Sequence, residues 1–369
     1  MKLLYITNGV DASGGLERVL ALKASYLAEH FNYEVTILTL NSHGKSLFYE
    51  FVDKIKFYNI KAKGSSIVYY LAYRKGIKNA IREIKPDVIS VCDDGLKGLL
   101  FPFVFGKKIP TVYERHASVD LNFFTDFKMN TTTKFKNYWS HKLMLFGARQ
   151  FSEFVVLTNG NKFDWNGVNT TVIPNPNPFE VDFSSMLNKD RTVLAVGSQT
   201  FNKGYDRLLK AWEVVHKKHP SWLLKVYGKK NEKLGLELEV DRLKLNDHVV
   251  FKNPINDIQV EYNKASIFVL PSRSEGFGMV LIEAMSFGLP CISFNCPHGP
   301  ADIIKQGQDG FLIQNGDIEA FAKAILNLIE NEELRIHMGE KAKENVQSYK
   351  TDAIMPLWDN LFTSLIKAS

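Results

Sequence analysis

The sequence contains little cysteine and no long apolar run. Its 369 residues include only three cysteines, Cys92, Cys291 and Cys296. This odd number, with two of the three in or beside expected buried strands, favours a reducing compartment over a disulfide framework. No stretch approaches the ~20 apolar residues of a membrane-spanning helix, and the N-terminus is too short in apolar length for a signal peptide. We therefore expect a cytoplasmic protein, with peripheral attachment to the inner face of the membrane left open.

Several ligand-binding motifs are also missing. The first expected turn, Asp11 to Arg18, lacks the G-x-G-x-x-G spacing of dinucleotide-binding proteins, which argues against an NAD enzyme. Cys291, Cys296 and His298 do not have a zinc-site spacing, and no D-x-D pair is present to hold a metal ion on a diphosphate. The formal net charge of +6 is mild and would suit an anionic membrane, an anionic substrate or neither. We find no nucleic-acid-binding motif, and so expect neither a metal nor a nucleic-acid partner.

The length and the alternation of patterns predict two domains. At 369 residues, of which 45% are hydrophobic, the chain is too long for one typical core. Short apolar runs alternate with helical patterns, and a polar stretch with prolines, Asn175 to Arg191, separates two such series. We therefore expect an α/β fold with two Rossmann-like, doubly wound parallel-sheet domains, residues 1–182 and residues 190–349. Strands are expected at residues 2–7, 34–40, 87–92, 111–114, 154–158, 171–173, 192–197, 223–228, 249–253, 266–270 and 291–294.

The stretch from Ser266 to Phe294 has the strongest ligand-binding pattern. Its sequence predicts a buried strand, a tight turn, a helix and a second strand. The turn is Glu275-Gly276-Phe277-Gly278, and Glu283 follows on the helix. The two glycines let the backbone approach a ligand, and a helix N-terminus favours a phosphate. Glu275 and Glu283 could then accept hydrogen bonds from sugar and ribose hydroxyls, although two solvated glutamates are the plainer interpretation.

Residues 272–290 resemble a known family. The pattern S-x-x-E-G-F-G followed by I-E-A-M-x-x-G-x-P resembles the E-x7-E element of retaining glycosyltransferases of the family 4 type, which have the GT-B architecture. The resemblance implies two domains facing a cleft, with Glu275 near a donor sugar and Glu283 on the ribose of a nucleotide. It also implies that Pro254 and Ile255 lie in a turn that holds the base through its backbone. A terminal helix, residues 350–369, is expected to return to the first domain.

A second segment of the family pattern surrounds Lys203. Residues 197–204, GSQTFNKG, follow an expected strand and resemble the family segment in which a glycine and an arginine precede a lysine-glycine pair. Alone, Lys203 would be interpreted as a solvated lysine; the resemblance implies that it binds the donor diphosphate. Ser198 stands where the family has the arginine, so one positive charge is missing. Arg273 or Arg18 could replace it, and an altered donor would also fit this difference.

The first domain contains three candidate donor-binding residues. Gly14 and Gly15 precede a helix as in the G-G-x-E-R/K loop of the same family, which implies that they approach the donor phosphate or sugar. An ordinary glycine-rich turn is the alternative. His116 follows the expected strand at residues 111–114. A lone histidine there is more often structural, but the resemblance implies that it faces the donor sugar.

Four charged residues lie near the ends of the strands in the first domain. We interpret Glu114 and Arg115 either as an ion pair or as residues that position the acceptor. Asp93 and Asp94 follow another strand and could face acceptor hydroxyls. All four are candidate acceptor-binding residues, because ligands collect at the carboxyl ends of parallel strands.

Residues Asn122 to Phe151 are both basic and aromatic. Such a segment could lie on an anionic membrane surface, with its aromatic rings at the headgroups and its lysines on the lipids. It could equally pack as a core helix with a basic outer face. Residues 54–85 are lysine-rich as well, so basic character is concentrated in the first half of the chain.

The resemblance covers nearly the whole chain and implies a retaining glycosyltransferase, which we expect to be metal-independent. We expect it to move a sugar from a UDP-sugar to a glycan or lipid-linked glycan in polysaccharide biosynthesis, with no cofactor because the nucleotide sugar is a co-substrate. His116, Lys203 and Glu275 are the expected catalytic residues, and the backbone N–H groups of Phe277 and Gly278 are expected to stabilise the leaving diphosphate. The alternatives are a GT-B nucleotide-sugar epimerase and a non-catalytic subunit that binds nucleotide sugar or glycan.

Overall fold

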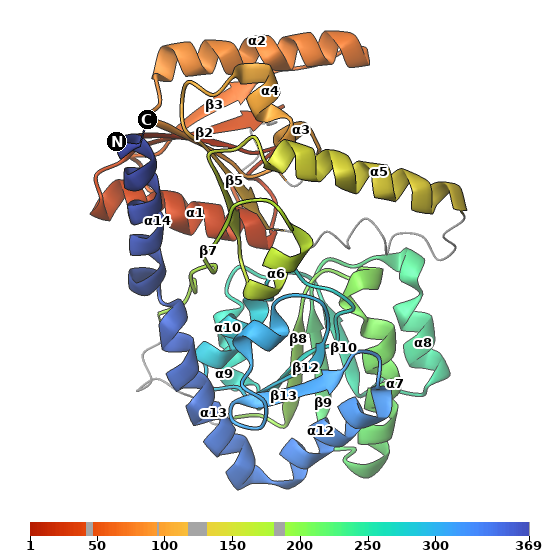
Figure 1. The fold of residues 1–369 in the computed structure, drawn as a ribbon. Coiled ribbons are helices and arrows are strands. Elements are labelled where there is room, and N and C mark those ends of the chain that lie inside the picture. The colour runs from red at the N-terminus through yellow and green to blue at the C-terminus, as the bar shows by residue number, and fades with distance from the viewer. Residues whose placement is uncertain (42–46, 94–95, 117–130, 181–188, 369) are drawn as a thin grey trace. The chain divides into compact units, whose positions relative to one another are not determined.

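The chain folds into two compact units. The computed structural model describes residues 1–41, 47–93, 96–116, 131–180 and 189–368, and for residues 96 and 131–138 it describes the backbone only. Within these ranges, the first unit contains residues 1–116, 131–178 and 351–368, and the second contains residues 179–180 and 189–350. Both are labelled by element in Figure 1.

A parallel sheet of seven strands forms the centre of the first unit. The strand order is β3-β2-β1-β4-β5-β6-β7, and all neighbouring strands are parallel. Because the chain starts at β1, moves outward to β3 and then returns to β4 on the other side, β1 and β4 mark the switch point of the sheet. The strands are β1 Lys2–Ile6, β2 Glu34–Leu40, β3 Lys56–Ile60, β4 Val88–Val91, β5 Thr111–Arg115, β6 Glu153–Val156 and β7 Thr170–Val172.

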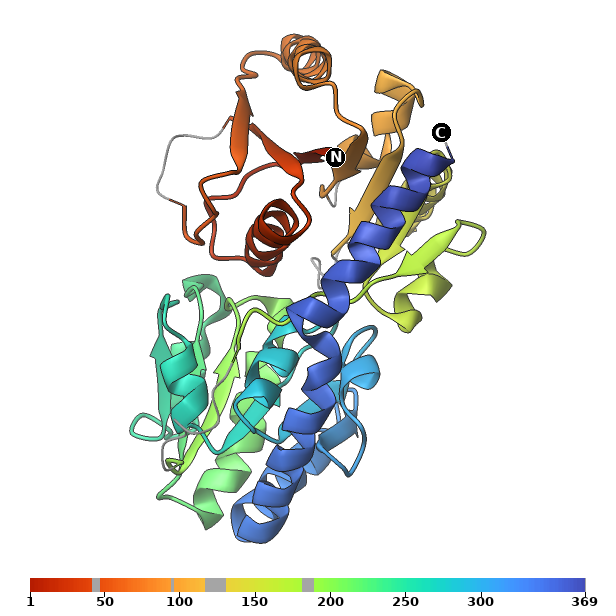
Figure 2. The ribbon, with the colours of Figure 1, turned by 90° about the vertical axis from the view of Figure 1, so that its left-hand side faces the viewer.

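Helices cover this sheet and close its core. The apolar face of α1 and the C-terminal helix α14 contact each other, and α14 also contacts β4. Figure 2 shows α14 as the blue helix that ends at the C-terminus. Trp358 and Phe362 of α14 are 1% and 0% exposed and belong to the same apolar cluster as Leu20 and Leu27 of α1. They are therefore packing residues. The helices are α1 Gly15–His30, α2 Ser66–Ile84, α3 Leu96–Leu99, α4 Phe101–Phe105, α5 Thr131–Ala148, α6 Asn159–Asp164 and α14 Thr351–Lys367.

The second unit repeats this plan with six parallel strands. Their order is β10-β9-β8-β11-β12-β13, so β8 and β11 mark the switch point. The strands are β8 Thr192–Val196, β9 Leu223–Tyr227, β10 Val249–Lys252, β11 Ile267–Leu270, β12 Cys291–Asn295 and β13 Gly310–Gln314. The helices are α7 Tyr205–Lys218, α8 Leu236–Arg242, α9 Gln259–Lys264, α10 Met279–Ser286, α11 Pro300–Ile303, α12 Ile318–Glu330 and α13 Glu332–Val346, with short 3₁₀ turns at η3 Phe201–Lys203, η4 Glu232–Leu234 and η5 Gln347–Tyr349.

The predicted fold class is confirmed: both units are Rossmann-like parallel sheets with helices. Every strand predicted from the sequence is present, with ends that differ by at most two residues. The sequence analysis missed two edge strands, β3 of the first sheet and β13 of the second. β3 is mostly exposed, so it lacks the apolar run that identified the central strands. β13 is only half-buried along most of its length. Among the described residues, no helix is both long and apolar enough to cross a bilayer.

Candidate active site

The switch point of the second sheet brings together the two segments that the sequence analysis singled out. The loop after β8 leads through residues 197–204 into α7, and the loop after β11 leads through residues 271–278 into α10. Both loops leave the carboxyl ends of neighbouring strands, where open α/β sheets bind ligands. The sheet topology therefore brings the loops that carry Lys203 and Glu275 to the same edge of the sheet, at the carboxyl ends of β8 and β11.

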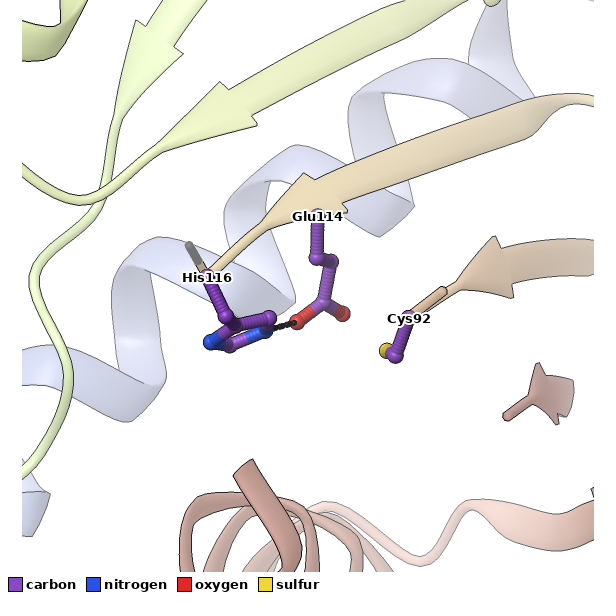
Figure 3. Close-up of side chains that lie close together, drawn as sticks. All are labelled: Cys92, Glu114 and His116. Carbon is purple, nitrogen blue, oxygen red and sulfur yellow. Dashed lines mark hydrogen bonds and ion pairs between the residues drawn. The ribbon is translucent and has the colours of Figure 1, made fainter. Parts of the chain in front are cut away.

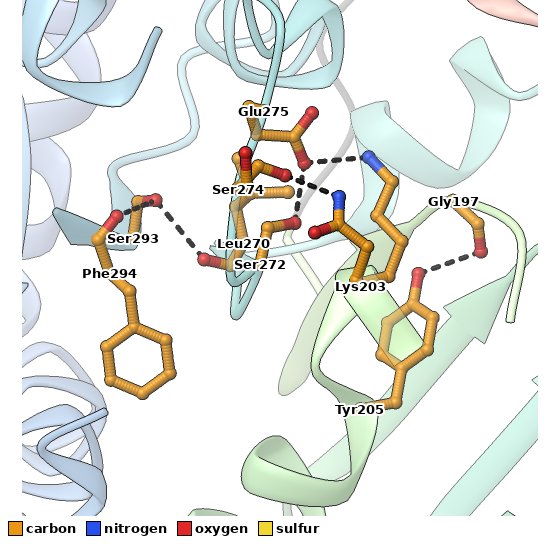
Figure 4. A network of polar contacts seen from close by, with 10 residues as sticks. Gly197, Lys203, Tyr205, Leu270, Ser272, Ser274, Glu275, Ser293 and Phe294 are labelled. Carbon is orange, nitrogen blue, oxygen red and sulfur yellow. Dashed lines mark hydrogen bonds and ion pairs between the residues drawn. The ribbon is translucent and has the colours of Figure 1, made fainter. Parts of the chain in front are cut away.

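Lys203 and Glu275 form an ion pair in this position. The Nζ atom of Lys203 lies 2.8 Å from Oε1 of Glu275, and the hydroxyl of Ser272 donates to the same oxygen at 2.5 Å (Figure 4). Glu275 is 9% exposed, whereas the Lys203 side chain is 23% exposed. The carboxylate is therefore held by its own unit, and the ammonium retains some contact with the surroundings.

The loops around this pair are packed closely against each other. A Cβ atom at Gly204 would lie 2.1 Å from the carbonyl oxygen of Pro271, so only glycine fits there. Asn202 donates its amide N–H to the carbonyl oxygen of Ser274 at 2.6 Å, and the backbone N–H of Arg273 donates to the carbonyl oxygen of Asn202 at 2.7 Å. These contacts join the two loops and fix the distance between Lys203 and Glu275.

The turn after Glu275 has the geometry expected of a helix start. Gly278 has a φ of 94°, which favours glycine, and it directly precedes α10. Gly276 lies beside it, and Phe277 is buried at 3% exposure with its ring 5.9 Å from that of Tyr349. The carbonyl oxygen of Phe277 lies where a Cβ atom at Gly299 would be, at 1.9 Å. The backbone of this turn is thus held on both sides.

Other donor-binding candidates of the second unit lie in different surroundings. Glu283 is 3% exposed and accepts a hydrogen bond from the hydroxyl of Tyr262 at 2.8 Å. Pro254 and Ile255 lie in the loop after β10, and Ile255 is 40% exposed. Ser198 is exposed in the loop after β8.

Arg273 is already engaged within its unit. Its two terminal nitrogens donate to the two carboxylate oxygens of Asp206 at 2.8 and 2.7 Å, and one of them also donates to the carbonyl oxygen of Phe201 at 2.6 Å. Burial would raise the pKa of Asp206, but the hydrogen bonds and charge of Arg273 outweigh it and lower the pKa. The charge of Arg273 is therefore balanced locally, which weakens the expectation that it replaces the missing arginine at Ser198.

In the first unit, Glu17 connects the glycine pair with His116. Gly14 precedes α1 and Gly15 begins it; a Cβ atom at Gly14 would lie 2.3 Å from a carboxylate oxygen of Glu17. Burial raises the pKa of Glu17, while the nearby His116 acts in the opposite direction. Glu17, in the first turn of α1, therefore lies within electrostatic reach of His116, which follows β5.

Glu114 lies behind His116 in a buried network. Its Oε2 atom accepts from Lys23 Nζ at 2.6 Å and lies 3.1 Å from His116 Nε2, and its Oε1 atom accepts from Ser90 Oγ at 2.6 Å. Burial alone would raise the pKa of Glu114, but Lys23 and His116 outweigh it and hold the pKa at about 2. Glu114 is therefore an ionised, fully buried carboxylate.

The interpretation of Glu114 and Arg115 as a mutual ion pair does not fit this geometry. Glu114 pairs with Lys23, and neighbouring residues of a strand point to opposite faces of the sheet. Arg115 lies 5.7 Å from the Trp165 ring. Asp93 is 5% exposed and lies 3.3 Å from Lys97 Nζ, whereas Asp94 lies outside the described residues.

The sequence analysis missed Lys23, although its position carried a signal. Lys23 lies between Leu20 and Leu27 on the apolar face of α1, at helical spacing. A lysine on a buried helix face requires a carboxylate or a ring to balance its charge. That requirement predicts a buried partner but does not say which of the acidic residues it is.

Two family models match the chain. The model described as Glycosyltransferase Family 4 matches residues 13–176, and the one described as Glycosyl transferases group 1 matches residues 179–345. The amylovoran biosynthesis glycosyltransferase AmsD of Erwinia amylovora is 30% identical over 98% of this chain and 99% of its own length. A Campylobacter jejuni N-acetyl-D-galactosaminyltransferase, whose name specifies a PP-undecaprenol-linked glycan, is 25% identical over 100% of both chains.

Solved structures show the same fold. TarM of S. aureus, crystallised with UDP and other ligands, has a TM-score of 0.81 at 16% identity and covers 98% of this chain and 99% of its own. HepE of Anabaena, in complex with UDP and glucose, has a TM-score of 0.77 at 18% identity and covers 99% and 100%. The chain therefore belongs to the glycosyltransferases of the family 4 type, which have the GT-B fold, as the sequence resemblance implied.

Proposed function

We propose that the protein is a retaining hexosyltransferase that moves a sugar from a UDP-sugar to a glycan or lipid-linked glycan in polysaccharide biosynthesis. The names of AmsD and of the Campylobacter jejuni enzyme support this acceptor class. The UDP bound to TarM and HepE supports the donor class. The protein would work on the cytoplasmic side of the membrane, where nucleotide sugars are its co-substrates.

The ion pair of Lys203 and Glu275 at the switch point of the second sheet is the observation that carries this proposal. When the bond between the sugar and the diphosphate breaks, negative charge collects on the phosphate oxygens. An ammonium group that is already in place stabilises this charge without reorganisation. Glu275 holds Lys203 at 2.8 Å and is itself fixed by Ser272. Its second carboxylate oxygen is suited to accept hydrogen bonds from sugar hydroxyls.

Retention follows from attack on the same face of the sugar. The acceptor oxygen forms a bond to the anomeric carbon while the bond from that carbon to the phosphate oxygen breaks. The acceptor proton passes to a departing phosphate oxygen, so atoms and charges balance. In this scheme Lys203 supplies the positive charge at the diphosphate, and transfer should proceed without a metal ion. His116 is assigned to a contact with a substrate hydroxyl.

A non-catalytic nucleotide-sugar-binding subunit is the second candidate function. The observation that favours it is Ser198, which removes a positive charge expected beside the diphosphate, while Arg273 is balanced by Asp206. Such a subunit would bind UDP-sugar as tightly as an enzyme but would not transfer it. Binding and turnover must therefore be measured separately.

A transfer assay with matched variants tests the proposal. Donors are first screened for thermal stabilisation, since a ligand that binds only the folded state raises its stability. Lys203→Ala and Glu275→Ala should each lower kcat by roughly 10²-fold or more, the usual effect of losing one such charge-stabilising group. Lys225→Ala is the control, because Lys225 forms a similar ion pair with Glu261, at 3.2 Å, in the same unit.

Stabilisation by UDP-sugar without turnover on any acceptor would instead support the binding subunit. Turnover that is lost on addition of EDTA would contradict metal independence.

We also propose that the first unit contacts an anionic membrane surface. Ile67, Val68 and Leu71 at the start of α2 are 73%, 53% and 55% exposed, and Arg74 and Lys75 follow on the same helix and are exposed as well. An exposed apolar turn beside basic residues suits a lipid headgroup region. In the segment from residue 122 to 151, the described part adds Trp139 and Phe146, at 58% and 52% exposure; residues 122–130 lie outside the described part.

A further inference from the structure

A buried ion pair lies behind His116. The side chains of Lys23 and Glu114 are both 1% exposed, and Nζ lies 2.6 Å from Oε2. A pair at this depth contributes little net stability, because the loss of hydration of both charges offsets their attraction. The ion pair therefore calls for an explanation other than stability, and its contact with His116 offers one.

Glu114 is held at both of its oxygens. Ser90 donates to Oε1, and Lys23 donates to Oε2. These two hydrogen bonds fix the plane of the carboxylate. The Nε2 atom of His116 lies 3.1 Å from Oε2 of Glu114 (Figure 3). Because Glu114 is ionised, it can only accept a hydrogen bond, and so the proton of this contact belongs to Nε2. In the neutral ring, Nδ1 is then the acceptor.

Lys23 is held in turn by the C-terminal helix. Its Nζ atom lies 3.3 Å from the centroid of the Trp358 ring and 5.7 Å from that of the Tyr5 ring, and an ammonium is attracted to the face of an aromatic ring. Trp358 is itself 1% exposed, so it cannot move aside without disturbing the core. The chain of contacts runs from α14 through α1 and β5 to the ring of His116.

A metal site is the rival interpretation of the same neighbourhood. Ligand atoms of Cys92, Glu114 and His116 lie within 4.8 Å of one another. The ammonium of Lys23 already occupies Oε2 of Glu114 and would repel a cation. Burial and the charge of Glu114 also raise the pKa of the Cys92 thiol, which opposes the thiolate that a metal requires. The geometry thus favours a positioning function for Glu114.

We propose that Lys23, Glu114 and Trp358 are positioning residues that fix the orientation of His116 and its Nε2–H tautomer. The inference rests on the proposed function only where it assigns His116 to a substrate contact. The tautomer of the His116 ring in the free protein does not depend on that assignment. The tautomer proposal and the proposed function can therefore be refuted independently.

The test is the NMR signature of the His116 ring in 15N-histidine-labelled protein, assigned by its absence in His116→Gln. At pH ~9, where a neutral imidazole is the expected form, the wild-type ring should show the Nε2–H tautomer alone. In Lys23→Met/Glu114→Gln, which removes both charges with little change of volume, a mixture of the two tautomers is expected. Trp358→Leu should shift the same signals, whereas Phe362→Leu, an equally buried change on α14, should not.

If the double variant does not fold, Ser90→Ala replaces it, with a smaller shift expected. An unchanged tautomer in these folded variants would overturn the proposal, and so would chelator- or Zn²⁺-dependent ring signals.

A kinetic cycle separates positioning from general damage to the fold. Glu114→Gln should lower kcat/KM by about 10- to 100-fold, the range that a misplaced active-site group can cause. In a His116→Ala background it should cause no further loss, because Glu114 acts through the ring. Equal losses in both backgrounds would contradict the positioning function. If neither the wild type nor any variant shows turnover, the proposed function fails. The NMR measurement of the His116 tautomer then still tests the positioning proposal.

Discussion

Glu114 shows how its surroundings decide what a carboxylate can do. From the sequence, Glu114 was expected at the end of a strand, where it could have paired with Arg115 or positioned an acceptor. In the structure it is 1% exposed and its oxygens accept from Ser90 and Lys23. The residue therefore acts inside the unit, and any effect on substrate passes through His116.

The low pKa of Glu114 predicts a specific loss of stability in acid. Its pKa is about 2 in the folded chain against an ordinary value of 4.5, so the folded state favours the ionised form. The part of the stability that depends on this ionisation is present above pH ~4.5 and is lost as the pH falls towards ~2. Urea unfolding at pH 7 and pH 3 measures the loss of unfolding free energy. Lys23→Met/Glu114→Gln lacks the carboxylate and should lose less; an equal loss in both proteins would contradict the assignment.

The candidate site was only partly predictable at the level of residues. Lys203 and Glu275 were named because their segments resemble a family, and the sheet topology brings them to 2.8 Å. The partners of Arg273 and Glu114 could not be predicted in the same way. Asp206 and Lys23 lie on helices distant in sequence, and no local pattern states which acidic residue meets which basic one.

At the level of elements, central strands were easier to predict than edges. β1, β8 and β11 are buried on both faces and appear in the sequence as short apolar runs. β3 lies at the edge of its sheet and alternates little, so its side chains did not distinguish it from a loop. The position of α14 was implied by the family resemblance, and Trp358 and Phe362 gave it a broad apolar face that explains its burial.

The exposed apolar turn of α2 predicts membrane binding that depends on charge. Wild-type protein should cosediment with vesicles that contain anionic lipid at low salt and should be released at high salt, because the attraction is screened. Ile67→Ser/Leu71→Ser and Arg74→Ser/Lys75→Ser should each lower the bound fraction severalfold. Leu238→Ser is the control, since Leu238 is 74% exposed but lies in the second unit. Retention on neutral vesicles, or variants that bind as well as the wild type, would exclude this surface.

For the whole molecule, the sequence predicted the fold class more fully than the chemistry. The alternation of strands and helices requires only local patterns, and both parallel sheets follow from it. The family matches then assign the chain to the glycosyltransferases. Donor sugar and acceptor depend on the shape of side-chain surfaces that no short motif encodes.

The anomeric configuration of the first product tests the central claim most directly. With a UDP-sugar that stabilises the protein and an accepted glycan, early product is analysed by ¹H NMR before any side reaction can change it. We predict that an α-linked donor gives an α-linked product, and that Lys203→Ala forms it at roughly 1% of the wild-type rate or less. A β-linked product, or full activity of Lys203→Ala, would contradict the account.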